Sequence, residues 1–285
     1  MNNVLYDYYV EKTGNGKPVI FLPGGGFSGN EGLNIAVYLQ NDYETHMMDL
    51  PGLGKGMGIQ ANRITSLEMA KWLKEYLDQK QIDKANLIGH SLGGAVLLAF
   101  TFHFPDRVNK LVLLDQGHKP FSRIPKSEFG VFAYAFPVLN FFTMIFGKPA
   151  LNLLSPLFSG DQNNTDFELE VQRFCKMVSI EDSEYVRKAL HNQTAVSTDG
   201  LNLMFGFYNL NLPEMLKGVK VPTYLAYATF DGVNEGEQAS THKHINKLQQ
   251  HKQLPISYRA VDGGHYVHWS DPSLLGDIRL FFQGE

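Results

Sequence analysis

The sequence predicts an α/β fold with a mostly parallel central sheet, helices on both of its faces and a helical cap inserted into the chain. Short apolar runs bounded by glycine alternate with helix-like stretches, which is typical of strand–helix–strand units. A glycine-rich hexapeptide, residues 89–94, separates one of these runs from a helix-like stretch. The alternation stops after residue 115 and resumes near residue 219. We therefore expect a core made of residues 1–115 and 219–285, and a cap made of residues 116–218.

The elements of the core follow in order along the chain. In the first half we expect strands over Pro18–Leu22, Thr45–Asp49, Ala85–Ile88 and Lys110–Asp115, with a helix from about Ser66 as its N-cap and another over Ala95–Phe100. In the second half we expect a strand over Val221–Ala228, a helix over Glu237–Gln249, a strand over Ile256–Val261 and a closing helix from about Pro272. Strands followed by helices in this way favour one parallel sheet.

The segment 116–218 shows no strand–helix alternation and is rich in aromatic residues. The aromatic residues of its first half are Phe129, Phe132, Tyr134, Phe136, Phe141, Phe142 and Phe146. A membrane span needs about 20 apolar residues, and Pro137 and Asn140 interrupt this stretch. A cap of helices over a pocket is therefore the favoured interpretation, with a shallow contact to a membrane surface as the alternative.

Composition excludes some classes of function. The net charge is −4 and no basic stripe carries interleaved aromatic residues, so nucleic acid is not an expected partner. The single cysteine rules out an intrachain disulfide framework and fits a reducing compartment, and the first residues lack the pattern of a secretory signal. We expect a cytoplasmic protein with no stable membrane span. The sequence does not decide the oligomeric state, for which a homodimer is one option.

The hexapeptide around Ser91 is the strongest indication of chemistry. It has the pattern G-x-S-x-G between a strand-like run and a helix-like one, which is the context of a nucleophile elbow. Gly89 and Gly93 leave room for close approach of the backbone, because neither has a Cβ atom. The helix that begins at the serine directs its free N–H groups and its dipole towards a developing oxyanion.

A serine hydroxyl needs a base, and the base needs an acid to orient it. His265 follows two glycines on the loop after the last strand, and Asp231 follows the strand that ends at Ala228. Two alternatives stay open, because Asp115 also lies at a strand end and His268 lies three residues beyond His265.

Six stretches of the chain, in this order, resemble the α/β-hydrolase fold superfamily. They are residues 21–26 (FLPGGG), 49–54 (DLPGLG), 89–94 (GHSLGG) and 104–108 (FPDRV), Asp231, and Gly264-His265. The resemblance implies Ser91 as the nucleophile, His265 as the base and Asp231 as the orienting acid, although some members place the acid at the position of Asp115. It also implies an oxyanion hole formed by the N–H groups of Leu92 and Gly25, with Gly26 as the second choice for the latter.

Two departures from the superfamily pattern bear on the site. Pro23 replaces the histidine that many members carry before the loop glycines, which leaves open how this loop is braced. Ala228 replaces a glycine that often begins the acid loop, which is a mild change.

The function that we expect is a serine hydrolase acting through an acyl-enzyme. The apolar cap favours a carboxylic ester with an apolar acyl or alkyl group as substrate, which predicts a carboxylesterase or a small lipase. Thioesterase, lactonase and carbon–carbon bond hydrolase are alternatives on the same triad, and a non-catalytic protein that binds a small ligand is a further one. No metal-binding pattern is present, so we expect neither a metal nor a cofactor.

Overall fold

A computed structural model of the chain describes residues 6–120, 132–154, 166–193 and 196–284. The strands are β1 (Val10–Gly14), β2 (Lys17–Leu22), β3 (Tyr43–Met48), β4 (Ala85–His90), β5 (Val108–Leu114), β6 (Thr223–Ala228) and β7 (Ile256–Val261). The helices around the sheet are α1 (Leu33–Leu39), α2 (Ser66–Gln79), α3 (Ser91–His103), α11 (Glu235–Gln249), α12 (Val267–Ser270) and α13 (Ser273–Gln283). Between β5 and β6 lie α5 (Phe132–Phe146), α6 (Lys148–Leu154), α7 (Phe167–Val178), α8 (Glu184–His191), α9 (Thr198–Tyr208) and α10 (Leu212–Lys217).

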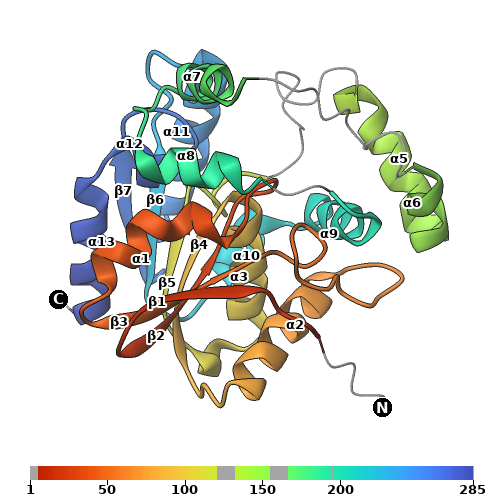
Figure 1. Cartoon of the computed structure of the whole chain (residues 1–285), viewed down its shortest axis with the longest axis horizontal. Coiled ribbons are helices and arrows are strands. Elements are labelled where there is room, and N and C mark those ends of the chain that lie inside the picture. Colours follow the sequence, from red (N-terminus) through yellow and green to blue (C-terminus); the bar gives the residue numbers. More distant parts are fainter. Residues whose placement is uncertain (1–5, 121–131, 155–165, 194–195, 285) are drawn as a thin grey trace.

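The seven strands form one sheet in the order β1-β3-β2-β4-β5-β6-β7. Only β1 is antiparallel to its neighbour, and the other pairs are parallel (Figure 1). The central strands read as continuous apolar runs because both of their faces are covered by helices. The predicted α/β fold with a mostly parallel sheet is therefore confirmed. Because β4 and β5 are neighbours at the centre of the sheet, the residues that follow their carboxyl ends lie close together at the middle of one sheet edge.

Two hydrophobic cores lie on opposite faces of the sheet. One buries the apolar side chains of α2, α3 and α10 together with two residues of α11. The other buries those of α1 and α13. The loops at the carboxyl edge are thus carried by a sheet that is packed on both sides.

The periodicity that predicts α2 also decides which of its faces is buried. Met69, Trp72, Leu73 and Leu77 recur at helical spacing and all are buried. The predicted N-cap, Ser66, is the first residue of the helix, and Thr65 takes the cap position. The cap is one residue earlier because the main-chain N–H of Thr65 donates to the carboxylate of Glu68, three residues later, as in a capping box.

The described part of segment 116–218 is helical, as expected, and its assignment as a cap stays a prediction.

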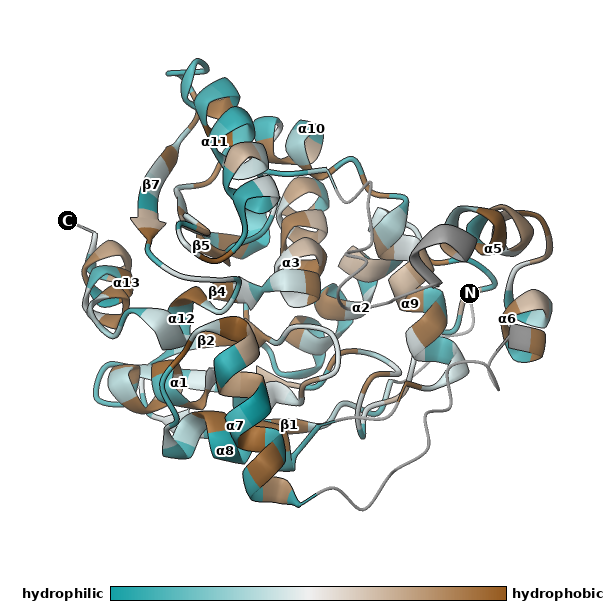
Figure 2. Cartoon of the chain, turned by 90° about the horizontal axis from the view of Figure 1, so that it is seen from above, coloured by the Kyte–Doolittle hydropathy of each residue, from teal (hydrophilic) through white to brown (hydrophobic). Residues whose placement is uncertain are grey.

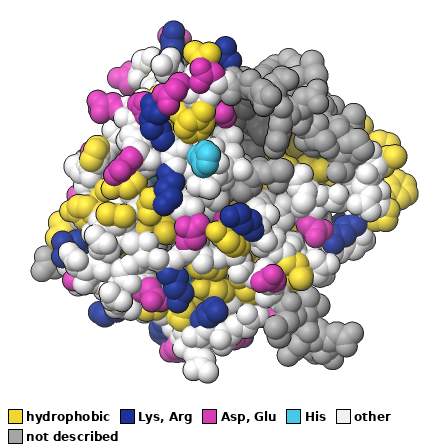
Figure 3. Space-filling model, viewed as in Figure 1, with side chains coloured by type: hydrophobic (Ala, Val, Ile, Leu, Met, Phe, Trp, Pro, Cys, Tyr) yellow, Lys and Arg dark blue, Asp and Glu magenta, His cyan; other side chains and the backbone are white. Residues whose placement is uncertain are grey.

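The helix α5 is not broken at the residues that interrupt the apolar stretch in the sequence, because it continues through Pro137. It contains no charged residue, and Figure 2 shows it as apolar along most of its length. Its exposed side chains include Phe141 and Phe146, and hydrophobic side chains gather at this edge of the molecule in Figure 3. Phe129 lies outside the described residues.

The stacked rings of Phe136 and Phe205, with centroids 4.5 Å apart, join α5 to α9. Through this contact the apolar helix is attached to α9, which in turn packs against α3. Among the helices that the structure describes, none has the length and apolar character needed to cross a membrane.

Candidate active site

The nucleophile elbow is formed where β4 ends at His90 and α3 begins at Ser91. Ser91 has a φ of 47°, in the left-handed region that a non-glycine residue enters at a cost of about 1–3 kcal/mol. A Cβ at Gly93 would lie 2.3 Å from the carbonyl oxygen of Leu22, and one at Gly89 would lie 2.6 Å from the backbone of the first helical turn. Both positions therefore require glycine, as the sequence predicts, and the turn holds the serine in a strained conformation.

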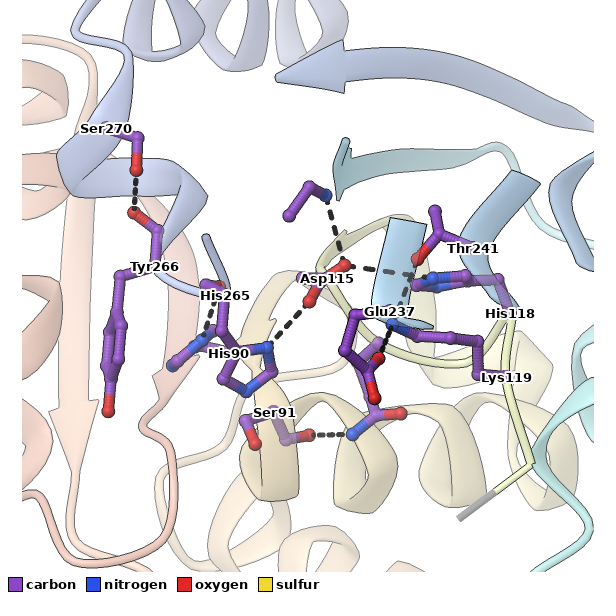
Figure 4. A network of polar contacts seen from close by, with 12 residues as sticks. His90, Ser91, Asp115, His118, Lys119, Glu237, Thr241, His265, Tyr266 and Ser270 are labelled. Atoms are coloured by element: carbon purple, nitrogen blue, oxygen red, sulfur yellow. Dashed lines mark hydrogen bonds and ion pairs between the residues drawn. The ribbon is translucent and has the colours of Figure 1, made fainter. Parts of the chain in front are cut away.

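The predicted base is in place beside the nucleophile. His265 lies on the loop after β7, and Figure 4 shows its ring between Ser91 and a carboxylate on the opposite side. Its Nδ1 atom lies 2.6 Å from Oδ2 of Asp115. Because the Asp115 carboxylate only accepts hydrogen bonds, Nδ1 carries the proton and Nε2 presents a lone pair on the side of Ser91.

The acid that contacts His265 is Asp115 and not Asp231, so the sequence-based assignment of Asp231 as the orienting acid is wrong for this structure. Asp231 is exposed, and its carboxylate accepts a hydrogen bond from Gln238 at 3.0 Å. The physical reason lies in the loop after β6, which turns Phe230 inward and leaves the next residue outside. Asp115, the alternative that the sequence left open, directly follows β5, the strand next to the nucleophile strand, and is buried.

The surroundings of Asp115 keep it ionised although it is buried. Burial by itself would raise its pKa, but the hydrogen bond from His265 and the positive charge of Lys119 outweigh burial and hold the pKa well below its usual range. The main-chain N–H of Ala228 also donates to Oδ1 at 3.1 Å. His118 lies 3.7 Å from the same oxygen, and burial lowers the pKa of this histidine to about 3, so it is neutral. A carboxylate fixed in this way orients His265 and stabilises its protonated form.

The other candidate base, His268, does not reach this carboxylate. It is fully buried in α12, and its Nε2 atom lies 3.8 Å from Oε1 of Glu31. Burial, reinforced by the charge of His90, lowers the pKa of His268 to about 3. His268 is therefore a neutral residue behind the site, and it is His265 whose ring contacts Asp115 and lies beside Ser91.

The predicted oxyanion donors lie beside the nucleophile. The N–H of Leu92 is in the first turn of α3, where an N–H group has no partner within the helix. Gly25 is close, because a Cβ on it would lie 3.6 Å from the Leu92 side chain, and no hydrogen bond engages its N–H within the described part of the chain. The N–H of Gly93 donates to the carbonyl of Pro23 at 2.9 Å, which joins this loop to the elbow. The geometry is compatible with the Gly25 and Leu92 pair, and the assignment of these donors stays a prediction.

Sequence reasoning missed three side chains that support the site. Glu31 is buried beside the nucleophile strand, Gln116 donates to the carbonyl of Ser91 at 2.8 Å, and Lys119 supplies positive charge near Asp115. None of these three side chains belongs to a sequence motif that indicates its role. Only the position of Gln116, directly after a residue at a strand end, could have drawn attention.

Comparisons with known proteins agree with the observed fold. A family model described as alpha/beta hydrolase fold matches residues 17–272. A 2-hydroxy-6-oxo-6-phenylhexa-2,4-dienoate hydrolase from Burkholderia cepacia is 33% identical over 113 residues, which are 38% of this chain and 40% of that protein. A 2-hydroxy-6-oxononadienedioate/2-hydroxy-6-oxononatrienedioate hydrolase from Comamonas testosteroni matches to the same extent. The matched segments thus cover less than half the length of these curated relatives.

Solved structures match over nearly the whole chain. An esterase from Thermogutta terrifontis has a TM-score of 0.66 at 18% identity, covering 98% of this chain and 93% of that one. The enol-lactonase from Burkholderia xenovorans LB400 has a TM-score of 0.63 at 13% identity, covering 98% and 97%. At such identities the likeness shows the fold alone.

Proposed function

Because the chain belongs to the α/β-hydrolase fold family, we propose that it is a serine hydrolase whose catalytic triad is Ser91, His265 and Asp115. One observation carries the proposal: Nδ1 of His265 lies 2.6 Å from the buried Asp115 carboxylate while the ring lies beside a serine on a strained elbow. A serine in an ordinary turn needs neither the left-handed backbone nor an oriented histidine.

The geometry supports the following reaction. Oγ of Ser91 attacks the carbonyl carbon of the substrate while Nε2 of His265 takes the hydroxyl proton. The N–H groups of Gly25 and Leu92 hold the resulting oxyanion, and loss of one such donor costs about 10²–10³ in kcat. When the tetrahedral intermediate collapses, the leaving group takes the proton from His265 and an acyl-enzyme remains. Water, deprotonated by the same histidine, then releases the acid and restores Ser91.

The names of the relatives favour a carbon–carbon bond as the one that breaks. Both proteins reported above are hydrolases of 2-hydroxy-6-oxo-dienoic acids, in which the carbonyl carbon is joined to a carbon of a conjugated chain. For this bond to break, the dienol first changes to its keto form: the 2-hydroxyl group loses its proton, C5 gains one, and the double bonds become C2=O and C3=C4. After attack on the C6 carbonyl, the C5–C6 bond breaks and its electron pair is delocalised through C3=C4 onto the C2 carbonyl as an enolate. The proton held by His265 then neutralises this carbanion, which makes a carbon leaving group feasible on the triad.

Carboxylic ester hydrolysis is the second candidate, and the aromatic side chains beside the base favour it. Phe27 packs against Tyr266, which directly follows the base. Lys119, a cation close to Asp115, is already engaged, because it donates to Glu237 at 2.9 Å and to Thr241 at 3.0 Å. An apolar acyl group fits such surroundings better than the carboxylate of a dienoic acid does.

A single panel of assays tests both candidates. The wild type and Ser91→Ala are compared on 2-hydroxy-6-oxo-6-phenylhexa-2,4-dienoate, followed by the loss of its conjugated absorbance, and on p-nitrophenyl esters from acetate to laurate. We expect the wild type to turn over at least one substrate class and Ser91→Ala to turn over neither. The class that the wild type hydrolyses faster shows whether the enzyme cleaves a carbon–carbon bond or an ester bond. Turnover that survives in Ser91→Ala would refute the mechanism.

A fluorophosphonate probe separates a wrong substrate from a wrong nucleophile. If the probe modifies Ser91 while neither substrate class reacts, the nucleophile is active and thioesters and lactones are tested next. If the probe leaves Ser91 unmodified in the folded protein, the serine hydrolase proposal fails.

A further inference from the structure

Behind the triad lies a buried pair of ionisable side chains that the reaction itself does not use. Glu31, in the short 3-10 helix Gly29–Gly32, is 0% exposed, and His90, the last residue of β4, is 1% exposed. Oε1 of Glu31 lies 2.6 Å from Nδ1 of His90. Burying a carboxylate costs free energy unless the group is paired, so we expect this buried pair to have a role in the site.

The hydrogen bonds of His90 indicate its charge. Its Nδ1 atom faces a carboxylate oxygen, and its Nε2 atom lies 3.1 Å from the carbonyl oxygen of His265. Both partners are acceptors, so a charged ring that donates from both nitrogens satisfies them all. Burial by itself would lower the pKa of His90 and raise that of Glu31, but the attraction between the two groups outweighs burial and shifts both in the opposite direction.

The pair is connected to each of the three loops that build the site. The second oxygen of Glu31 accepts a hydrogen bond from the N–H of Gly24, next to the expected oxyanion donor Gly25. His90 itself precedes Ser91 in the elbow. The Nε2 contact of His90 reaches the main chain of the base, His265. Figure 4 shows the His90 ring beside His265, where it meets the main chain of the base.

We propose that Glu31 and His90 form a buried ion pair that positions the oxyanion loop, the nucleophile elbow and the base loop relative to one another. The pair replaces the brace that a histidine before the loop glycines would supply, since Pro23 stands at that position. It acts through Gly24 and the main chain of His265, so both members are positioning residues and not catalytic ones. This inference rests on the proposed serine hydrolase function.

Glu31→Gln tests the pair, because the amide keeps the size of the side chain and one acceptor oxygen but removes the charge. Displacement of catalytic groups by about 1 Å can cost about 10²-fold in rate, so we expect kcat per labelled Ser91 to fall about 10- to 100-fold, with KM changed less than about threefold. Glu214→Gln is the matched control, because its exposed pair with Lys217 on α10 undergoes the same chemical change and should leave kcat unaltered.

A double-mutant cycle distinguishes positioning by the pair from general damage. If the pair acts as a unit, Glu31→Gln combined with His90→Gln loses no more activity than the worse single variant. The proposal would be overturned if the reduction of kcat in the double variant equalled the product of the reductions in the two single variants. It would also be overturned by a folded Glu31→Gln protein with wild-type kcat. Rates are counted per serine titrated by the fluorophosphonate probe, so that partial unfolding does not enter the comparison.

The charge of His90 is measured independently of activity. In ¹⁵N-histidine-labelled protein, and equally in Ser91→Ala, we expect both ring nitrogens of His90 to carry protons at neutral pH, with the resonances assigned by their loss in His90→Gln. A neutral His90 ring would overturn the ion pair. If wild-type Ser91 is not labelled by the probe, the proposed function fails instead, and this spectrum still decides the state of the pair.

Discussion

Exchange of the two candidate acids for asparagine separates their roles in one comparison. Asp115→Asn removes a charge that lies 2.6 Å from Nδ1 of His265 and is fully buried. Asp231→Asn makes the same chemical change at an exposed carboxylate that contacts Gln238. The pair of variants is thus matched in chemistry and differs in position.

The expected loss in Asp115→Asn has two sources. A charge-assisted hydrogen bond contributes about 1.5–3 kcal/mol, which corresponds to about 10–150-fold in rate if it acts in the transition state. The asparagine amide can also donate to Nδ1 of His265, which stabilises the tautomer in which Nε2 is protonated and cannot accept the serine proton. The same substitution in the serine protease triad lowers kcat about 10⁴-fold. We expect a fall of about 10³–10⁴ for Asp115→Asn and less than about twofold for Asp231→Asn.

The assay is kcat/KM on the best substrate of the panel, with the folded state of each variant checked by circular dichroism. Asparagine at position 115 still offers an oxygen to the N–H of Ala228, so the β6 loop should keep its conformation. A loss in Asp231→Asn as large as that in Asp115→Asn would refute the assignment of the acid. Retention of more than a tenth of the activity in Asp115→Asn would do the same.

Three further predictions follow from contacts around the site. Gly93→Ala places a Cβ 2.3 Å from the Leu22 carbonyl oxygen. We therefore expect the free energy of unfolding in urea to fall by about 1–3 kcal/mol and kcat to fall at least about tenfold. Unchanged values of both would contradict the close packing at the elbow. His118 has a folded pKa of about 3, so the unfolded chain binds its proton first as pH falls below about 6.5, and this residue lowers stability by about 1.4 kcal/mol per pH unit. His118→Gln should reduce the slope of the unfolding free energy by about that amount between pH 6 and 4, while the slope due to His268 remains, and a curve parallel to the wild type would contradict this. Phe27→Ala removes edge contacts to Phe174 and Tyr266, with an expected cost of about 3–5 kcal/mol in urea unfolding; a cost below about 1 kcal/mol would show that this aromatic cluster is loosely packed.

The core of the fold could be predicted from the sequence because each signal is local. The predicted strand Ile256–Val261 is the observed β7 residue for residue, and the predicted strand before the nucleophile differs from β4 only at its end. The central strands are apolar because the sheet is covered on both faces there, and glycines follow several of them where the chain must turn. The antiparallel edge strand β1 carries no apolar run, since it is only half-buried, and the sequence gives no indication of it.

The identity of the acid could not be predicted, because it depends on how two loops turn. Asp115 and Asp231 both follow parallel strands, so both are candidates by position alone. The burial of Phe230 directs Asp231 outward, and the positive φ of Asp115 directs its carboxylate towards His265. Such loop conformations are set by tertiary packing and have no signature in the spacing of residues.

Glu31 illustrates a second limit. It lies 59 residues from its partner His90, and its neighbours Asn30 and Gly32 form a polar stretch of the kind that is usually exposed. Only the assembled sheet brings it under the oxyanion loop. A buried charge pair is therefore found from its surroundings and not from its sequence.

The most direct test of the triad is mass spectrometry of the protein after reaction with a fluorophosphonate, alongside turnover of the same sample. We expect one phosphonate per chain, located on Ser91, with turnover lost in proportion to labelling, and labelling slowed about 10³-fold or more in Asp115→Asn. Labelling at another residue, or turnover that persists after Ser91 is fully modified, would contradict the assignment of Ser91, His265 and Asp115 as the catalytic groups.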